Sequence, residues 1–219
     1  MSVIIPTWCE AGLVREAVRA AARIGDEVVV ADGHSPDGTA ELARAAGARV
    51  VMAPRGRGPQ MHAGARCARG DVLLFLHVDA HLPPRARDAI ERALDDPDVD
   101  GGNFLLRFVP DGSWARFFTW ANDLRRRWMR IYYGDSALFM RRRAYLALGG
   151  FRPLPIMEDY ELVRRLERVT RTAYVRDVQV TASARRFEHA PLRTLVLWVA
   201  VQVLYMLGLP PRHLARLYR

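Results

Sequence analysis

The 219-residue sequence contains no lysine, since all 33 of its basic residues are arginine. A Walker A phosphate-binding loop, Schiff-base catalysis and the attachment of pyridoxal phosphate each require a lysine, so these three kinds of site are excluded. Cysteine is also scarce. Cys9 and Cys67 lie far apart and match no zinc-binding spacing, so we expect reduced thiols in a cytoplasmic protein. The first residues show no basic leader and no cleavage site, and we expect no signal peptide.

The composition is that of a globular protein. Hydrophobic residues make up 50% of the chain and charged residues 26%, which argues against collagen, long disorder and a disulfide scaffold. The length predicts one domain with an appendage. The net charge of +9 is uneven, because residues 1–100 carry 12 arginines against 15 acids and residues 101–219 carry 21 against 9. A basic second part suits a polyanion, an anionic membrane surface or a phosphorylated substrate, and equally a solvated arginine-rich face.

The first half of the chain alternates short β-branched runs with stretches of helical period. Strands are predicted at 3–5, 27–31, 48–52 and 71–78, and helices near 12–24, 37–46, 60–69 and 84–94. Runs that are apolar on both faces belong in a parallel sheet covered by helices on both sides. The sequence therefore predicts a doubly wound α/β fold.

The second half is less regular. It predicts an alternating strand at 103–109, a Trp/Arg-rich helix at about 113–130 and a strand near 136–140, followed by short elements. Residues 194–209 are almost entirely apolar, but sixteen residues fall short of the ~20 that a spanning helix needs. We therefore favour a buried or interfacial helix there over a transmembrane one.

Polar residues follow the first two strands. Thr7 and Glu10 follow the first strand and Asp32 ends the second, at the sheet edge where open α/β folds bind ligands. Burying the Asp32 carboxylate without a partner would be costly, which favours a contact with a ligand. No G-x-G-x-x-G motif opens the first helix, which argues against a dinucleotide site. Arg57 lies in a Gly/Arg loop, where glycine lets the backbone and a guanidinium approach a phosphate or a base.

The strand at 71–78 runs into His77, Asp79 and His81, and a period of two places these three side chains on one side. A carboxylate directly after so apolar a strand indicates a ligand or a cation at Asp79. Carboxylate oxygens suit Mg²⁺, and an imidazole shifts the preference toward Mn²⁺. For His81 alone we favour a hydrogen-bonded residue at the rim over a metal ligand.

Glu158 and Asp159 open a predicted helix, where the helix dipole favours acids. Pro153 and Pro155 precede them and favour an extended entry that aims Asp159 into a cleft. Such a carboxylate serves as the general base in group transfer to a hydroxyl. We expect Asp159, Asp32 and Asp79 to gather around one hollow at the carboxyl edge of the sheet.

Taken in order, these residues resemble the bacterial inverting glycosyltransferases of family two, which have the GT-A fold. The sequence also resembles a small bacterial subgroup with an H-x-D signature, some members of which are linked to arsenosugar biosynthesis. The resemblance is carried by Ile5-Pro6-Thr7 with Glu10, Asp32-Gly33-x-Ser35-x-Asp37-Gly38-Thr39, Arg57, His62-Ala63-Gly64, Asp79, Tyr133-Gly134-Asp135, Gly149-Gly150-Phe151 and Met157-Glu158-Asp159.

The resemblance implies a role for each matched residue. His77 stands where the broad family usually has an Asp, and His62 where it usually has an Asn. The implied roles are the nucleotide site for Thr7, Glu10, Asp32 and Arg57, the metal for Asp79 and His77, catalysis for the base Asp159 and for Glu158, the acceptor for Gly134 and Asp135, and a late metal or diphosphate contact for His189.

The resemblance also implies a GT-A domain at 1–190, with a nucleotide-binding half at 1–100 and an acceptor half at 101–190. Residues 191–219 would form a helical appendage that contacts the inner face of the membrane. The expected reaction transfers a sugar, with inversion, from a UDP-type nucleotide sugar to a hydroxyl of a small molecule, a glycan or a lipid-linked acceptor. It would use Mg²⁺ or Mn²⁺ and no nucleic acid.

Three alternatives remain open at this point. The first is a nucleotidyltransferase, which shares a nucleotide crevice and a metal-binding acid but releases pyrophosphate. The second is a nucleic-acid or anionic-surface binding module that uses the arginine runs 125–127 and 141–143 with nearby tryptophans. The third is a catalytically silent relative that still binds nucleotide.

Overall fold

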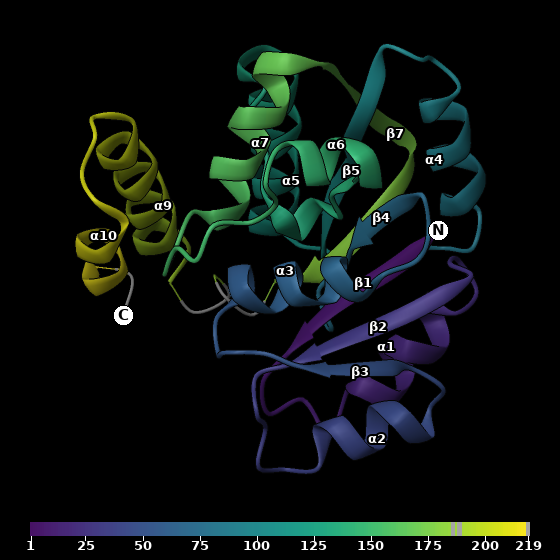
Figure 1. The fold of residues 1–219 in the computed structure, drawn as a ribbon. Coiled ribbons are helices and arrows are strands. Elements are labelled where there is room, and N and C mark those ends of the chain that lie inside the picture. Colours follow the sequence, from purple (N-terminus) through teal and green to yellow (C-terminus); the bar gives the residue numbers. More distant parts are fainter. Residues whose placement is uncertain (185–186, 188–189, 218–219) are drawn as a thin grey trace.

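The computed structural model describes residues 1–184, 187 and 190–217. Its described residues form one seven-stranded sheet flanked by helices (Figure 1). The strands are β1 (Ser2–Thr7), β2 (Glu27–Asp32), β3 (Arg49–Met52), β4 (Val72–Phe75), β5 (Val99–Val109), β6 (Phe139–Arg141) and β7 (Arg171–Ser183). The helices are α1 (Val14–Ala21), α2 (Thr39–Ala45), α3 (Arg57–Cys67), α4 (Ala86–Leu94), α5 (Ser113–Met129), α6 (Arg142–Ala147), α7 (Glu158–Val169), α9 (Pro191–Met206) and α10 (Pro211–Leu217), with a short 3₁₀ helix η1 (Gly134–Ser136).

The sheet has the strand order β3-β2-β1-β4-β6-β5-β7. The first four strands are parallel, and Thr7 lies beside Asp32 at the carboxyl ends of β1 and β2. β6 runs antiparallel to both β4 and β5, whereas β5 and β7 are parallel to each other. The predicted α/β class and its parallel first half are confirmed, and the second half makes the sheet mixed.

Both faces of the sheet are covered, which explains why the strands are apolar on both sides. On one face, Val3, Val30 and Leu74 pack in a cluster that also contains residues of α1, α2 and α4. On the other face, Ile4 and Phe75 pack with residues of α3, α6 and α7. Strands buried on both faces read as continuous Val/Ile/Leu runs, and this pattern allowed their prediction.

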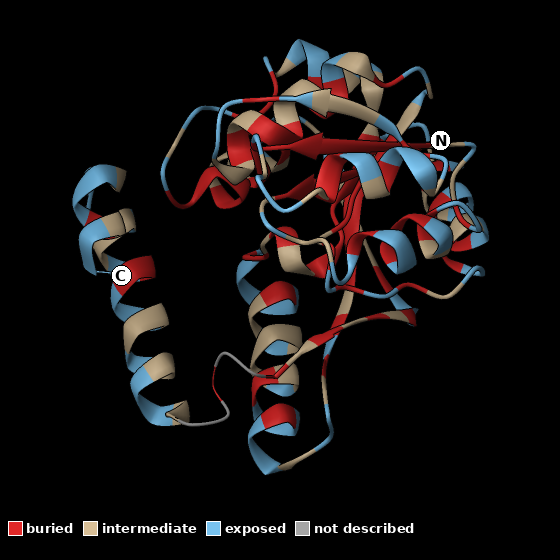
Figure 2. Cartoon of the chain, turned by 90° about the horizontal axis from the view of Figure 1, so that it is seen from below, coloured by how far each residue is buried: buried red, intermediate tan, exposed pale blue. Residues whose placement is uncertain are grey.

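The C-terminal helices pack on the second half of the chain. Val201 on α9 and Leu214 on α10 are buried in a small cluster with Ile156 and Tyr160. Figures 1 and 2 show that the pair lies beside the rest of the molecule, with many exposed residues along its length. Within the residues that the structure describes, no helix has both the length and the apolar character needed to cross a bilayer.

Candidate active site

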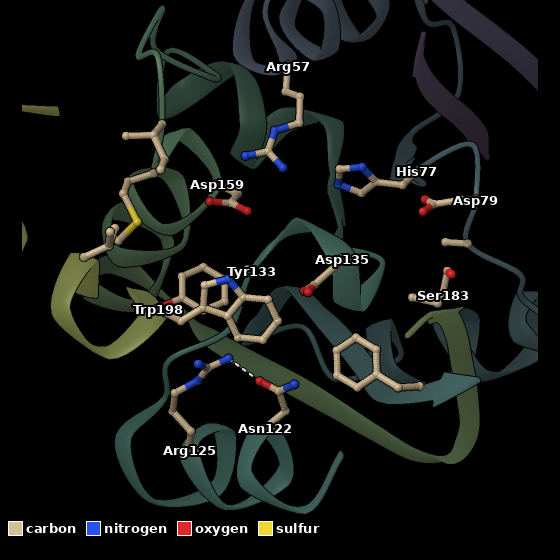
Figure 3. Close-up of a pocket in the computed structure, with 16 residues that line it drawn as sticks. Arg57, His77, Asp79, Asn122, Arg125, Tyr133, Asp135, Asp159, Ser183 and Trp198 are labelled. Carbon is tan, nitrogen blue, oxygen red and sulfur yellow. Dashed lines mark hydrogen bonds between the residues drawn. The ribbon is translucent and has the colours of Figure 1, made fainter. Parts of the chain in front are cut away.

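A cavity of about 130 Å³ opens beyond the carboxyl end of β4. It lies between η1, the first turn of α7, α5 and α9, so that segments far apart in the sequence form its walls (Figure 3). Five of the residues predicted from the sequence line it: Arg57, His77, Asp79, Asp135 and Asp159.

Asp159 is held in place by backbone donors at the start of α7. Its side chain is largely buried, with 7% of the residue exposed. The N–H of Gly134 donates to Oδ2 at 2.8 Å, and the N–H of Tyr160 donates to Oδ1 at 2.7 Å. A Cβ atom on Gly134 would lie 3.2 Å from Nε2 of His77 and 3.3 Å from Oδ2 of Asp159. Because position 134 is a glycine, the His77 imidazole and the Asp159 carboxylate can both approach the backbone at this point.

Glu158 lies behind Arg57 and not among the residues that line the cavity. It is 2% exposed, and its Oε1 is 2.9 Å from Nε of Arg57, which forms an ion pair. Burial, and then the charge of Asp159, raise the pKa of Glu158 to about 7, and the Arg57 guanidinium opposes this shift. The structure therefore places Glu158 where it orients Arg57 toward the cavity.

The segment after β4 differs from the prediction. β4 ends at Phe75 and the chain then turns, so the period-two argument for His77, Asp79 and His81 was wrong. His77 and Asp79 both line the cavity, and the His77 ring lies between Asp159 and Asp79 in Figure 3. His81 instead forms an antiparallel bridge with Thr181 beside a separate hollow. His81 can reach Thr181 because the chain turns away from the direction of β4 after Phe75.

Acidic residues gather on the Asp79 side of the cavity. Burial, and then the charges of Asp79 and Asp37, raise the pKa of Glu10. Mutual repulsion of this kind is relieved when a cation binds between carboxylates. In the described part of the chain, however, no group of three or more His, Cys, Asp or Glu side chains is arranged to hold a metal by itself. His189, the late candidate, lies outside the described residues.

The Asp32 carboxylate is fully buried but is not unpaired. Its Oδ1 accepts hydrogen bonds from Thr7 Oγ1 at 3.0 Å and Ser35 Oγ at 2.7 Å, and its Oδ2 accepts one from the Ser35 N–H at 2.7 Å. The argument that Asp32 needs a ligand to offset its burial was therefore wrong. Asp32 does not line the cavity, so only Asp79 and Asp159 of the three expected acids share it. Asp32 and Thr7 remain at the β1–β2 edge, where they order the loop that follows β2.

Gln60 is a buried polar residue that the sequence reasoning missed. Its Nε2 donates to the carbonyl oxygens of Thr7 at 2.6 Å and Ala31 at 2.9 Å, and its Oε1 accepts the Gly56 N–H at 3.1 Å. This side chain ties the ends of β1 and β2 to the loop that carries Arg57. A single glutamine in a helix gives no periodic signal, so only the fold reveals this contact.

The wall opposite Asp159 was also missed. It includes Asn122 and Arg125 from α5, Tyr133 before η1, and Trp198 from α9. The sequence did show an Arg/Trp-rich segment here, which suggested a nucleic-acid surface. However, the arginines at 125–127 do not share one surface, because each has different neighbours.

Two neighbours of Arg125 show this difference. Arg126 is 6% exposed and bonds Asn103 Oδ1 at 2.7 Å, while Arg127 lies 3.7 Å from a carboxylate oxygen of Asp123. In the second run, Arg141 and Arg143 both lie near Asp100. Neither run presents a continuous unpaired basic surface, which argues against the nucleic-acid alternative.

The family follows from a direct match. Residues 2–149 match the model of glycosyl transferase family 2. The chain belongs to glycosyl transferase family 2. The matched range includes Thr7, Asp32, Arg57 and Asp79 and ends before Asp159.

Relatives agree with this assignment. An uncharacterized glycosyltransferase of Rickettsia bellii (strain RML369-C) is 33% identical over 92 residues, which is 42% of this chain and 31% of the relative. The match thus spans under a third of that relative's length. Together with the family match, it supports a glycosyltransferase.

Solved structures confirm the GT-A fold expected from the sequence. Glucosyl-3-phosphoglycerate synthase from Mycobacterium tuberculosis, in complex with Mn²⁺, UDP-glucose and phosphoglyceric acid, is similar with a TM-score of 0.68 and 20% identity. The likeness covers 95% of this chain and 80% of that one. S. aureus TarS 1-349 in complex with UDP-GlcNAc gives a TM-score of 0.68 at 19% identity, with coverage of 86% and 59%. At these identities the likeness establishes the fold.

Proposed function

We propose that this family 2 chain transfers a sugar from a UDP-type nucleotide sugar to an acceptor hydroxyl, with inversion at the anomeric carbon. The observation that carries the proposal is the presence of Asp79 and Asp159 in one cavity at the carboxyl edge of the sheet. Inversion needs a base on the acceptor side and charge stabilisation on the side of the leaving diphosphate. Two separately placed carboxylates can divide these roles.

Asp159 is assigned the role of base. The acceptor oxygen attacks the anomeric carbon, the bond from that carbon to the diphosphate oxygen breaks, and Asp159 takes the acceptor proton. Two backbone N–H groups fix its oxygens, so the carboxylate is oriented before the acceptor arrives. Gly134 and Asp135 are assigned to the acceptor, and Glu158 supports Arg57 from behind.

A divalent cation, Mg²⁺ or Mn²⁺, suits the Asp79 side. Asp79 and His77 are the residues that would hold it, and the repulsion between Asp79 and Glu10 favours a bound positive charge. When bound, such an ion neutralises charge on the leaving diphosphate. The similar synthase from M. tuberculosis was crystallised with Mn²⁺ and UDP-glucose, which supports a divalent cation and a UDP-type donor for this chain.

The remaining assignments follow the same division of the chain. Thr7, Glu10, Asp32 and Arg57 are assigned to the nucleotide within residues 1–100, and residues 101–190 form the acceptor half. Within the proposed appendage, α9 completes the acceptor side through Trp198. We also assign the chain to the small subgroup with the H-x-D signature, because His77 stands two residues before Asp79. Some members of that subgroup are linked to arsenosugar biosynthesis.

The base assignment is tested with Asp159→Asn. General-base catalysis contributes roughly 10²–10⁴-fold, so we expect kcat for sugar transfer to fall by at least 100-fold while the Kd for UDP stays within about twofold. Asp177→Asn, which changes an exposed acid paired with Arg92, is the control and keeps full activity. Full transfer activity in a folded Asp159→Asn protein would reject the assignment.

The donor is tested by thermal shift. UDP, GDP, ADP and CDP, and the corresponding nucleoside triphosphates, are each added with and without Mn²⁺, because a ligand that binds the native state raises Tm by mass action. We expect the largest rise with UDP and Mn²⁺ together. A rise with nucleoside triphosphates alone, together with pyrophosphate release, would favour the nucleotidyltransferase alternative.

We also propose that α9 contacts the inner face of an anionic membrane. Leu192, Val196, Val199, Val203 and Met206 recur every three or four residues on α9 and are each about half exposed or more. Exposed arginines flank this face at 193, 212 and 216, which complements anionic headgroups.

This contact is tested with a charge placed on the apolar face. Val199→Glu is expected to reduce co-sedimentation with phosphatidylglycerol vesicles at least fivefold, whereas Val169→Glu, an exposed valine at the end of α7, is the control and leaves it unchanged. Equal binding of both variants, or a dimer that Val199→Glu dissociates without vesicles, would contradict the membrane contact.

A further inference from the structure

The α5 wall of the cavity carries a positive charge, that of Arg125, and none of the described residues supplies a counterion for it. Arg125 lines the cavity, and its guanidinium carbon lies 4.5 Å from the ring centre of Tyr133. One terminal N–H₂ donates to Asn122 Oδ1, as the dashed line in Figure 3 marks. Its Nε is shielded from solvent and has no hydrogen-bond partner.

The neighbouring arginines of the same helix are paired with acids. Arg126 lies 3.5 Å from Glu167, and Arg127 lies 3.7 Å from Asp123. Among the described residues, no carboxylate oxygen lies within 4.0 Å of Arg125. A partly buried guanidinium without a counterion is costly, and stacking on Tyr133 offsets only part of that cost.

The cavity is therefore polarised. Carboxylates of Asp79 and Asp159 face it from one side, Arg125 with Asn122 faces it from the other, and Asp135 lies between the two sides (Figure 3). Tyr133 stands between the two sides. Burial raises the pKa of its hydroxyl, Arg125 opposes this shift, and Asp159 and Asp135 reinforce it. The Tyr133 hydroxyl is thus within electrostatic reach of both sides.

We propose that Arg125 and Asn122 form a subsite for an anionic group, a phosphate or a carboxylate, on the acceptor. The inference rests on the proposed function, because it takes the cavity to be where the acceptor binds. A guanidinium and an amide N–H₂ are the donors that recognise such oxyanions. The carboxylates of Asp79 and Asp159 repel an anion from the opposite side, so an acceptor with a negative group enters with its hydroxyl toward Asp159.

The subsite is tested with inorganic phosphate as the probe. Phosphate is titrated calorimetrically in the presence of saturating UDP, so that the donor diphosphate site is filled, and again without UDP. We expect Arg125→Gln to weaken phosphate binding at least tenfold, as the loss of a charge-assisted contact implies. Arg125→Lys, which keeps the charge but loses the planar fork, should give an intermediate affinity.

Arg127→Gln is the matched control, since it removes an arginine from the same helix outside the cavity. Phosphate binding and the Kd for UDP should both stay at the wild-type value in this variant. An unchanged Kd for UDP in Arg125→Gln shows that the fold is intact. Phosphate binding that survives in Arg125→Gln, that falls equally in Arg127→Gln, or that is absent in the wild type would overturn the subsite.

A second measurement compares acceptors that differ in one group. Glycerol and glycerol 3-phosphate are offered with UDP-glucose, and the phosphorylated acceptor is expected to gain at least tenfold in kcat/KM in the wild type and to lose that gain in Arg125→Gln. Equal use of both acceptors by the wild type counts against the subsite. Phosphate binding that depends on Arg125 in a protein that binds no UDP would support the subsite and reject the proposed function.

Discussion

Replacing Glu158 with glutamine tests whether burial controls the ionisation of the acid beside Arg57. The fold raises the pKa of Glu158 from 4.5 to about 7. One pKa unit corresponds to about 1.36 kcal/mol, so the shift amounts to about 3 kcal/mol. Because the folded pKa lies above the unfolded one, the folded chain holds this proton more tightly. The resulting stability is fully present below pH 4.5 and is lost as the pH rises through 7.

Urea unfolding of the wild type and Glu158→Gln at several pH values between 4.5 and 8 measures this effect. Glutamine cannot ionise, so the free energy of unfolding of the variant, relative to the wild type, should rise by about 3 kcal/mol across this range. The attraction between Arg57 and the ionised Glu158 is already contained in the folded pKa of Glu158, so it adds no separate slope.

Glu91→Gln, which removes an exposed glutamate paired with Arg87, corrects for the general effect of the substitution. Parallel curves for the wild type and Glu158→Gln between pH 4.5 and 8 would refute the reasoning.

The remaining predictions concern the geometry of the cavity. Gly134→Ala places a Cβ atom 3.2 Å from His77 and 3.3 Å from Asp159, so we expect kcat to fall roughly 10- to 100-fold with little change in the Kd for UDP; an unchanged kcat would contradict this. Gln60→Leu leaves buried backbone groups unpaired and should lower the free energy of unfolding by about 2–4 kcal/mol in urea, and a loss below 1 kcal/mol would count against it. Asp79→Asn should raise the Mn²⁺ concentration for half-maximal activity at least tenfold, which a metal titration measures.

Much of the first half could be predicted because its signal is local. Strands buried on both faces must be continuous apolar runs, and the helices between them must repeat at the helical period. The predicted strand at 27–31 and helix at 84–94 agree with β2 and α4 within two residues. The positions of Arg57 and Asp79 near one edge follow from the rule that parallel strands share a carboxyl edge, whereas Asp159 opens α7 after the antiparallel β6 and lies outside that rule.

Several errors arose where side-chain partners decide the outcome. The sequence identified Asp32 as a buried acid but could not show that Ser35, three residues later, supplies two hydrogen bonds. It treated His81 as a continuation of β4, although the chain turns after Phe75. It grouped Glu158 with Asp159, yet successive residues on a helix point about 100° apart, so one faces Arg57 and the other the cavity.

The sequence by itself determined the α/β class, the order of the elements and the family to which the motifs belong, because these depend on local periodicity and on residues near strand ends. Only the tertiary structure decided which groups face one another across the cavity. Arg125 comes from α5, Asp159 from α7 and Trp198 from α9, and no local pattern links them. Their meeting depends on how the mixed half of the sheet and the C-terminal helices pack, which is set by apolar contacts between segments distant in the chain.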